Sequence, residues 1–366
     1  MRGVILPGDS TAQVRDFPMP QPGRGQVVVR TGASGICGSD IGYIYRGYKT
    51  HKGLNGEPAY KGVIAGHEPC GRIVSVGEGV RRFGVDDDVI VYHIHGCGVC
   101  RNCRAGYGIS CSDQSRRQAY GWQRDGGHAE FVLVDESECV PLTAPLSYTD
   151  GALIACGFGT AYEGLRRTGL HGGEDLLVVG LGPVGLAAAM IGRMLGARRV
   201  IGLERNQERI EFVRGLGLVD EIVIADDDAV DSVLTLTGGK GCEVSVDASG
   251  STPGRLAAVS AAAEWGRVAL LGEGGALETE VSENLLHKQL TITASWVTSV
   301  QGLEDLARML AAEGLHPEIV VSHRFVLEDA DEAYRVAAGG ATGKVVLMPL
   351  VSASEKSTRE RSDAAG

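Results

Sequence analysis

The chain lacks the long apolar segments that a membrane protein needs. No stretch of about 18 uninterrupted apolar residues occurs among its 366 residues, so we expect no membrane-spanning helix. Its first residues, MRGVILPGDSTAQV, contain no apolar run of the length that a signal peptide requires. We therefore expect a cytoplasmic protein whose thiols stay reduced.

Positive charge is also in short supply. The sequence has 35 Lys and Arg against 46 Asp and Glu, which gives a formal net charge of −11. Proteins that bind nucleic acid need a basic surface, so we expect no nucleic-acid partner. The length allows two domains with large cores, as in an enzyme that acts on a small molecule.

Cysteine is sparse everywhere except in one segment. Four of the nine cysteines lie in CGVCRNCRAGYGISC, with the spacing C-x2-C-x2-C-x7-C. Four thiolates in a tetrahedral shell suit a structural zinc ion, and an iron–sulfur cluster is the competing interpretation. The loop is hydrophilic and has no Pro after its last cysteine, which favours zinc. The ligands would be Cys97, Cys100, Cys103 and Cys111, a closed shell with no position for catalysis.

A second set of candidate metal ligands comes from three separated segments. GICGSD contains Cys37, AGHEPCG contains His67, and LIACGFGTAYEG contains Cys156. Two cysteines and one histidine leave one zinc position open, as in a catalytic zinc site. Each residue alone would be weak evidence, because a single buried cysteine more often fills a core. The three together with the cysteine-rich loop make a specific pattern.

A nucleotide-binding motif follows in the second half. The apolar run LLVVG predicts a buried parallel strand, and a G-x-G-x-x-G pattern opens an Ala-rich helix after it. Gly180, Gly182 and Gly185 would permit a tight turn beside a pyrophosphate, with Pro183 and Val184 between them at the helix N-terminus.

Glu204 lies nineteen residues after Gly185, near the distance expected for a carboxylate that binds the ribose hydroxyls. Such a carboxylate would repel a 2′-phosphate and favours NAD, whereas Arg205 could pair with that phosphate. We place Arg205 over the adenine or in solvent. Ser249 and Gly250 end another predicted strand, where the cofactor would pass.

The remaining pattern alternates strands and helices. A doubly wound parallel sheet is expected from this alternation. Further strands are predicted at 220–225, 242–250, 266–272, 290–296 and 343–350, and a helix at 304–315. The tail, residues 351–366, is polar and without periodicity, so we predict disorder there.

The chain resembles the medium-chain zinc-dependent alcohol dehydrogenases, in particular their threonine/sorbitol dehydrogenase-like branch. The resemblance covers roughly residues 1–350 and depends on GHE, the cysteine-rich loop and the glycine motif. It implies a GroES-like, β-rich catalytic domain (1–157 and 298–350) and a Rossmann domain that binds NAD (158–297). It also implies two zinc ions per chain and a homodimer or homotetramer.

The resemblance also implies roles for individual residues. Cys37, His67 and Cys156 would hold the catalytic zinc, and Glu68 could approach the metal as an alternate ligand. Asp40 would orient His67 by a hydrogen bond. Ser39 would take the proton of the alcohol while a hydride passes to NAD⁺.

Two positions depart from the family pattern. Many members have a histidine that relays protons two residues after Asp40, where this chain has Gly42; His51 or water could replace it. Polyol-type members often carry a carboxylate at the position of Cys156.

The segments around the expected site are rich in polar groups. Simple alcohol dehydrogenases place an apolar aromatic residue just before the first cysteine of the loop, where this chain has VYHIHGC. We expect a polar secondary alcohol as substrate: a polyol, a sugar or aminocyclitol, or an amino alcohol. The polar side chains in question are His93, His95, Trp122, Gln123, Arg124, Asp125, Tyr43, Tyr45 and Arg46. The alternative is that they only decorate loops and have no contact with the substrate.

Other interpretations remain open. A non-catalytic NAD- or zinc-binding protein could keep this fold, and a zinc-free enone reductase of the same superfamily should lack both ligand sets. A threonine-type or simple alcohol dehydrogenase is the nearer alternative. We interpret Cys70, Cys139 and Cys242 as packing thiols and His128 as structural or pocket-lining.

Overall fold

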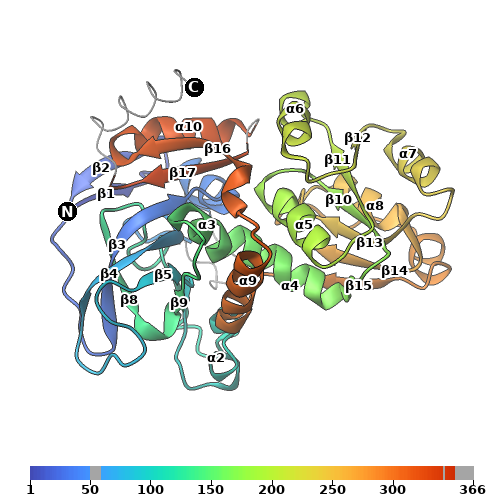
Figure 1. The fold of residues 1–366 in the computed structure, drawn as a ribbon. Helices are drawn as coiled ribbons and strands as arrows, with labels where there is room; N and C mark the ends of the chain where they lie inside the picture. The colour runs from blue at the N-terminus through green and yellow to red at the C-terminus, as the bar shows by residue number, and fades with distance from the viewer. Residues whose placement is uncertain (50–58, 341–342, 351–366) are drawn as a thin grey trace. The chain divides into compact units, whose positions relative to one another are not determined.

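The computed structural model describes residues 1–49, 59–340 and 343–350. The chain folds into two compact units (Figure 1). Of the described residues, unit 1 comprises 1–49, 59–156, 299–340 and 344–350, and unit 2 comprises 157–298 and 343. His51 and the predicted disordered tail lie outside the described residues.

Unit 1 is built around one mixed sheet of seven strands. The order is β16-β17-β3-β4-β5-β9, and β8 pairs with β3. Only β16 and β17 pair in parallel; the other pairs are antiparallel. The strands are β3 (Gln26–Gly35), β4 (Glu68–Val76), β5 (Asp88–Val91), β8 (Phe131–Asp135), β9 (Cys139–Pro141), β16 (Val321–Val326) and β17 (Lys344–Met348).

Two small sheets and several short helices complete unit 1. β1 (Arg2–Ile5) pairs with β2 (Gln13–Asp16), and β6 (Ile94–His95) with β7 (Gln118–Ala119). The two longer helices are α9 (Val300–Ala312) and α10 (Ala330–Gly339). The short ones are α1 (Gly38–Asp40), η1 (Ile41–Tyr45), α2 (Arg101–Arg104), η3 (Gly108–Ser110), η4 (Glu136–Glu138), α3 (Tyr148–Leu153), η5 (Ile154–Phe158), η7 (Pro317–Val320) and η8 (Leu327–Asp329).

Two apolar clusters support unit 1. One lies inside the curved sheet and includes Val27, Val29, Ile73 and Val132. Val27 and Val29 reach the same cluster because successive side chains of a strand point to opposite faces, so residues two apart share a face. The other cluster joins η1, α10 and β17, and contains Ile44, Tyr45, Tyr334 and Leu347.

Unit 2 is a parallel six-stranded sheet with helices on both faces (Figure 1). The order β12-β11-β10-β13-β14-β15 corresponds to the 3-2-1-4-5-6 arrangement of dinucleotide-binding folds. The doubly wound prediction is confirmed. The strands are β10 (Asp175–Val179), β11 (Arg199–Glu204), β12 (Glu221–Ile224), β13 (Cys242–Asp247), β14 (Ala262–Leu270) and β15 (Thr291–Ala294).

Local sequence explains where the helices of unit 2 begin and end. Pro183 opens α5, and the Asn206 side chain caps α6 by accepting from the Arg209 amide. Gly169 and Gly217 end α4 and α6 in the left-handed conformation. The helices are α4 (Gly159–Thr168), α5 (Pro183–Met194), α6 (Gln207–Leu216), α7 (Ala229–Leu236), α8 (Thr252–Ser260) and η6 (Ser282–Leu286).

The predicted strands and the predicted late helix are all present, with shifted ends. The helix expected at 304–315 begins at Val300, because the Ser299 side chain accepts a hydrogen bond from the Gly302 amide and caps it there. Among the described residues, no helix combines the length and the apolar character needed to cross a membrane.

Candidate active site and metal centres

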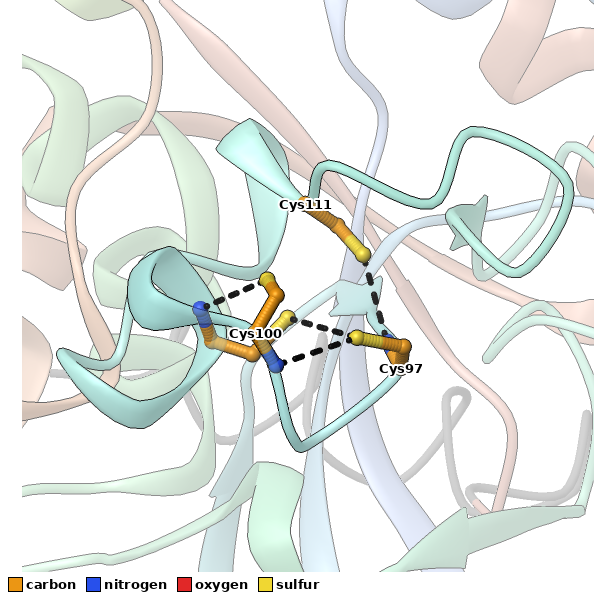
Figure 2. A group of neighbouring side chains, drawn as sticks. Cys97, Cys100 and Cys111 are labelled. Atoms are coloured by element: carbon orange, nitrogen blue, oxygen red, sulfur yellow. Dashed lines mark hydrogen bonds between the residues drawn. The ribbon is translucent and has the colours of Figure 1, made fainter.

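The cysteine-rich loop brings its four sulfurs together. The Sγ atoms of Cys97, Cys100, Cys103 and Cys111 all lie within 4.8 Å of one another. Backbone amides point at them: Cys97 N–H donates to Cys111 Sγ at 3.3 Å, and Cys100 N–H donates to Cys97 Sγ at 3.4 Å (Figure 2). None of the nine cysteines forms a disulfide. The donor set fits a closed tetrahedral zinc site.

The local backbone favours the thiolate form of Cys100, the form that zinc requires. The amides of Cys103 and Ser112 lower the pKa of Cys100 to about 5. The loop also lies against α9, because the Val300 amide donates to Gly106 O at 3.0 Å. Gly106 has φ +82°, a backbone conformation that strains any residue with a side chain, so glycine suits this contact. The loop therefore braces the start of α9.

The second set of donors also converges. Cys37 precedes α1, His67 precedes β4, Glu68 opens β4, and Cys156 lies in η5. One donor atom from each lies within 4.8 Å of all the others. Hydrogen bonding from Cys156, together with the nearby His67, holds the pKa of Cys37 well below its ordinary value although burial opposes this. Two sulfurs and an imidazole nitrogen fit zinc, with the Glu68 carboxylate alongside.

Asp40 fixes the orientation of His67. The Nδ1 of His67 lies 2.8 Å from Oδ1 of Asp40, a residue that is fully buried. Since Nδ1 is taken by the carboxylate, Nε2 is the nitrogen left to face the two cysteines. This is the hydrogen bond that the resemblance led us to expect.

Glu68 is held by a lysine that sequence reasoning missed. Lys344 opens β17, is 4% exposed, and places its Nζ 2.5 Å from Glu68 Oε2. Burial raises the pKa of Glu68 to about 7, although Lys344 opposes that shift. Gly35 lies between them: a Cβ there would be 2.0 Å from Glu68 Oε2. The only signal in the sequence was a lysine at the start of an apolar strand.

Ser39 lies in α1, two residues after Cys37. Gly42 follows in η1, and a Cβ at this position would meet no described atom within 4 Å. The position beside Gly42 is therefore open space among the described residues.

The glycine motif lies where strand β10 ends. Gly180 has φ +85°, and a Cβ on Gly185 would lie 1.9 Å from Gly180 O. Pro183 and Val184 open α5. A Cβ at Gly182 would meet no described atom within 4 Å, so the helix N-terminus faces open space of the kind a pyrophosphate occupies.

Ser249 and Gly250 follow β13, the neighbour of β10. The Ser249 hydroxyl donates to Asp247 Oδ1 at 2.6 Å, and its Cα lies 2.9 Å from where a Cβ of Gly180 would be. Both turns thus meet at the carboxyl edge of the sheet, where the strand order reverses and dinucleotides bind.

Glu204 ends β11 and is only 5% exposed. Its carboxylate accepts from the amides of Leu181 (3.0 Å), Arg205 (2.8 Å) and Asn206 (3.0 Å), and from Arg209 Nη1 at 3.3 Å. Burial would raise the pKa of Glu204, but these donors outweigh it and lower the pKa. The carboxylate therefore joins the glycine turn to the start of α6, a structural role that the sequence did not reveal. Arg205 itself is exposed.

Most of the polar side chains expected near the substrate are engaged elsewhere. Tyr45 stacks on Tyr334, and Arg46 donates to Ala338 O at 2.6 Å. Asp125 accepts from the Ile64 amide at 2.9 Å. Gln123 bonds to the Ala119 amide and to Ala59 O, and His95 and Arg124 pair with Glu138 and Asp135. Each of these six therefore bonds to or packs against protein groups, as expected if these side chains only decorate loops.

Three of the expected residues do lie at the second donor set. The rings of His93 and Trp122 have their centroids 5.2 Å and 6.1 Å from that of His67, and Tyr43 packs against Trp122. The Nδ1 of His93 lies 2.8 Å from Ala155 O and must carry the proton. Burial lowers the pKa of His93 to about 3, so its Nε2 is an acceptor.

A third cluster of metal-ligand types already contains a cation. His95, Asp135 and Glu138 converge within 4.8 Å, but the guanidinium of Arg124 lies 2.7 Å from Asp135 and above the Tyr120 ring. We interpret this cluster as structural.

The residues interpreted as structural are buried. Cys70, Cys139 and Cys242 are 0% exposed. His128 is also fully buried, with Nδ1 2.9 Å from the Ser34 hydroxyl, and burial lowers its pKa to about 4.

Comparison with known proteins identifies the class. Residues 23–144 match the alcohol dehydrogenase GroES-like domain, and residues 183–312 match the zinc-binding dehydrogenase family. The uncharacterized zinc-type alcohol dehydrogenase-like protein YphC of Escherichia coli is 46% identical over 95% of this chain and 98% of its own. An L-threonine 3-dehydrogenase of Rhizobium etli is 30% identical over 91% and 94%.

A solved NAD-dependent alcohol dehydrogenase has the same fold. It superposes with a TM-score of 0.82 at 30% identity, covering 95% of this chain and 99% of its own. The protein is thus an oxidoreductase with a GroES-like and a Rossmann domain. It belongs to the zinc-dependent alcohol dehydrogenase family, in the threonine/sorbitol dehydrogenase-like branch, and its cofactors are zinc and NAD.

We predict two zinc ions of different lability. A chelator should remove the zinc held by Cys37, His67 and Cys156 first, because that shell is open, and abolish activity before the protein unfolds. His67→Ala should lose one zinc and keep the fold, whereas Cys100→Ser should lower the melting temperature by roughly 5 °C or more. Metal analysis by mass spectrometry and thermal unfolding provide the measurements.

Cys242→Ser is the matched control, since this thiol lies outside both donor sets and its variant should retain both metals. A fully active enzyme with one zinc per chain would contradict the prediction.

We further predict that Glu204 sets the preference for NAD. The ratio of kcat/KM for NAD⁺ over NADP⁺ should exceed about tenfold, which corresponds to about 1.4 kcal/mol, and should fall in Glu204→Gln, which keeps the side-chain size but removes the charge. Glu204→Ala should additionally lower the melting temperature, because three backbone amides lose their acceptor. An unchanged ratio in both variants would leave Glu204 with its structural role alone.

Proposed function

We propose that the enzyme oxidises a polar secondary alcohol to a ketone with NAD⁺, at a zinc ion held by Cys37, His67 and Cys156. The observation that carries the proposal is the convergence of these three donors and Glu68 within 4.8 Å. When bound, zinc would lower the pKa of the alcohol hydroxyl, and NAD⁺ would accept the hydride.

Residues of the chain bind the metal, orient its ligands and transfer the proton. Cys37 and Cys156 supply the sulfur donors, and Asp40 holds His67 in one tautomer. Ser39 accepts the hydroxyl proton and passes it to water in the open space beside Gly42. Glu68 forms an ion pair with Lys344 and is an alternate metal ligand, which can approach the metal when ligands exchange.

His93 supports a polar substrate. The His93 ring has its centroid 5.2 Å from that of His67, and its Nε2 is an acceptor because Nδ1 carries the proton. A substrate with only an alkyl chain would offer this Nε2 no hydrogen-bond donor. An unpaired buried acceptor costs about 1–3 kcal/mol. A second hydroxyl or an ammonium group on the substrate could donate to it, as a polyol, a sugar, an aminocyclitol or an amino alcohol would.

A threonine-type activity is the second candidate. The 30% identity to an L-threonine 3-dehydrogenase favours it, and the ammonium group of such a substrate could donate to His93. The expectations of a homodimer or homotetramer and of a cytoplasmic location remain predictions.

We predict that Ser39→Ala lowers kcat by roughly 10²–10⁴-fold, the range for a positioned proton-transfer group. Zinc content and NAD⁺ affinity should not change, because Ser39 is neither a metal ligand nor part of unit 2. Ser39→Thr, which keeps the hydroxyl, should retain most of the turnover. Wild-type turnover in the alanine variant would mean that another group carries the proton.

We also predict that polyhydroxylated or amino alcohols surpass ethanol and butanol in kcat/KM. His93→Phe should shift the ratio at least about tenfold toward the alkanols, because it replaces the acceptor by an apolar ring. His95→Gln is the control: His95 pairs with Glu138, so its variant should leave the ratio unchanged. If the alkanols are already the better substrates of the wild-type enzyme, the substrate class is wrong.

A further inference from the structure

Asp40 serves more groups than His67 alone. Its Oδ1 accepts from His67 Nδ1 at 2.8 Å and from Trp122 Nε1 at 2.9 Å, and its Oδ2 accepts from the Cys37 amide at 3.2 Å. A carboxylate oxygen has about two acceptor sites, so His67 and Trp122 fill Oδ1 between them. Two of the three donors therefore belong to metal-ligand residues, and the third belongs to Trp122.

Trp122 reaches Asp40 from a different part of the chain. It follows β7, is 9% exposed, and meets the His67 ring edge-on at an interplanar angle of 86°. Its own backbone is held at both ends: its amide donates to Ala119 O at 3.3 Å, and its carbonyl accepts from the Lys61 amide at 2.9 Å. The indole is therefore carried by a loop whose backbone is hydrogen-bonded on both sides of Trp122.

The chemistry of this bond differs from that of an ordinary buried indole. A tryptophan N–H needs a partner in a core, and a neutral carbonyl would suffice. Here the acceptor is a carboxylate, which makes a stronger, charge-assisted bond. Without that bond the Asp40 carboxylate would be held by His67 and the Cys37 amide, and the His67 ring would lose part of the restraint on its orientation.

We propose that Trp122 is a positioning residue for the catalytic metal: by donating to Asp40 Oδ1 it holds the carboxylate, and through it His67, in the orientation that metal binding requires. This inference rests on the proposed function, in which Cys37, His67 and Cys156 hold the catalytic zinc. The same hydrogen bond connects the loop that carries Trp122 to the metal ligands, so a displacement of this loop would change the orientation of His67.

The test measures zinc release from the fully loaded enzyme into excess chelator. Residues that support a ligand from outside typically change metal affinity 10–100-fold. Trp122→Phe removes the N–H and keeps an aromatic ring, and it should release the catalytic zinc about tenfold faster. Zinc in the four-cysteine loop of the same molecules is the internal reference and should not change. Trp265→Phe, at a tryptophan that is 69% exposed in unit 2, should behave like wild type.

A double-mutant cycle distinguishes positioning from packing. If Trp122 acts through Asp40, Trp122→Phe should add little to the effect of Asp40→Ala, which removes the acceptor of the indole N–H. A full tenfold effect in the Asp40→Ala background, or unchanged zinc release in Trp122→Phe itself, overturns the inference. A wild-type enzyme that binds zinc only in the four-cysteine loop overturns the proposed function instead.

A measurement on the wild-type enzyme covers the case in which Trp122→Phe does not fold. Removal of the catalytic zinc should shift the indole ¹H–¹⁵N resonance of Trp122, while that of Trp265 stays in place. Trp265→Phe and Trp296→Phe supply the assignments by elimination. An unmoved Trp122 resonance overturns the inference.

Discussion

Ionisable side chains buried inside unit 1 are the constraint on which the site depends. Asp40, His67, Glu68 and Lys344 are each at most 4% exposed. An unpaired ion in such surroundings costs several kcal/mol, so each group needs a partner. Asp40 pairs with His67, and Glu68 pairs with Lys344. The His67 ring is therefore held by a hydrogen bond and Glu68 by an ion pair, in addition to the backbone that carries them.

Strand register makes these pairs possible. Gly35, at the end of β3, lies opposite Glu68 of β4 on one side and opposite Val346 of β17 on the other. Because Gly35 has no side chain, the Lys344 ammonium and the Glu68 carboxylate can meet across it. The apolar strands thus do more than form a core: their pairing brings a lysine from the end of the chain to a glutamate near its beginning.

The two units contribute different kinds of interaction. Unit 1 supplies side-chain donors, whereas unit 2 supplies backbone: an open helix N-terminus at Gly182 and a glycine turn that no larger residue could form. Glu204 of unit 2 has both an expected binding role and a structural role. Its carboxylate is where the ribose is expected, and it also ties the turn after β10 to the start of α6.

The sequence by itself determined the fold class, the four-cysteine loop and the nucleotide motif, because each depends on short spacings and on local periodicity. The second donor set comes from three separated segments, and the resemblance to a known family was needed to group Cys37, His67 and Cys156. It could not assign Lys344 to Glu68 or Trp122 to Asp40, since these partners are 276 and 82 residues apart and meet only through strand register and loop packing. Nor could it separate His93, which faces His67, from His95, which pairs with Glu138. Neighbouring polar residues look alike in a sequence, and only the tertiary structure decides which of them already has its hydrogen bonds filled by the protein.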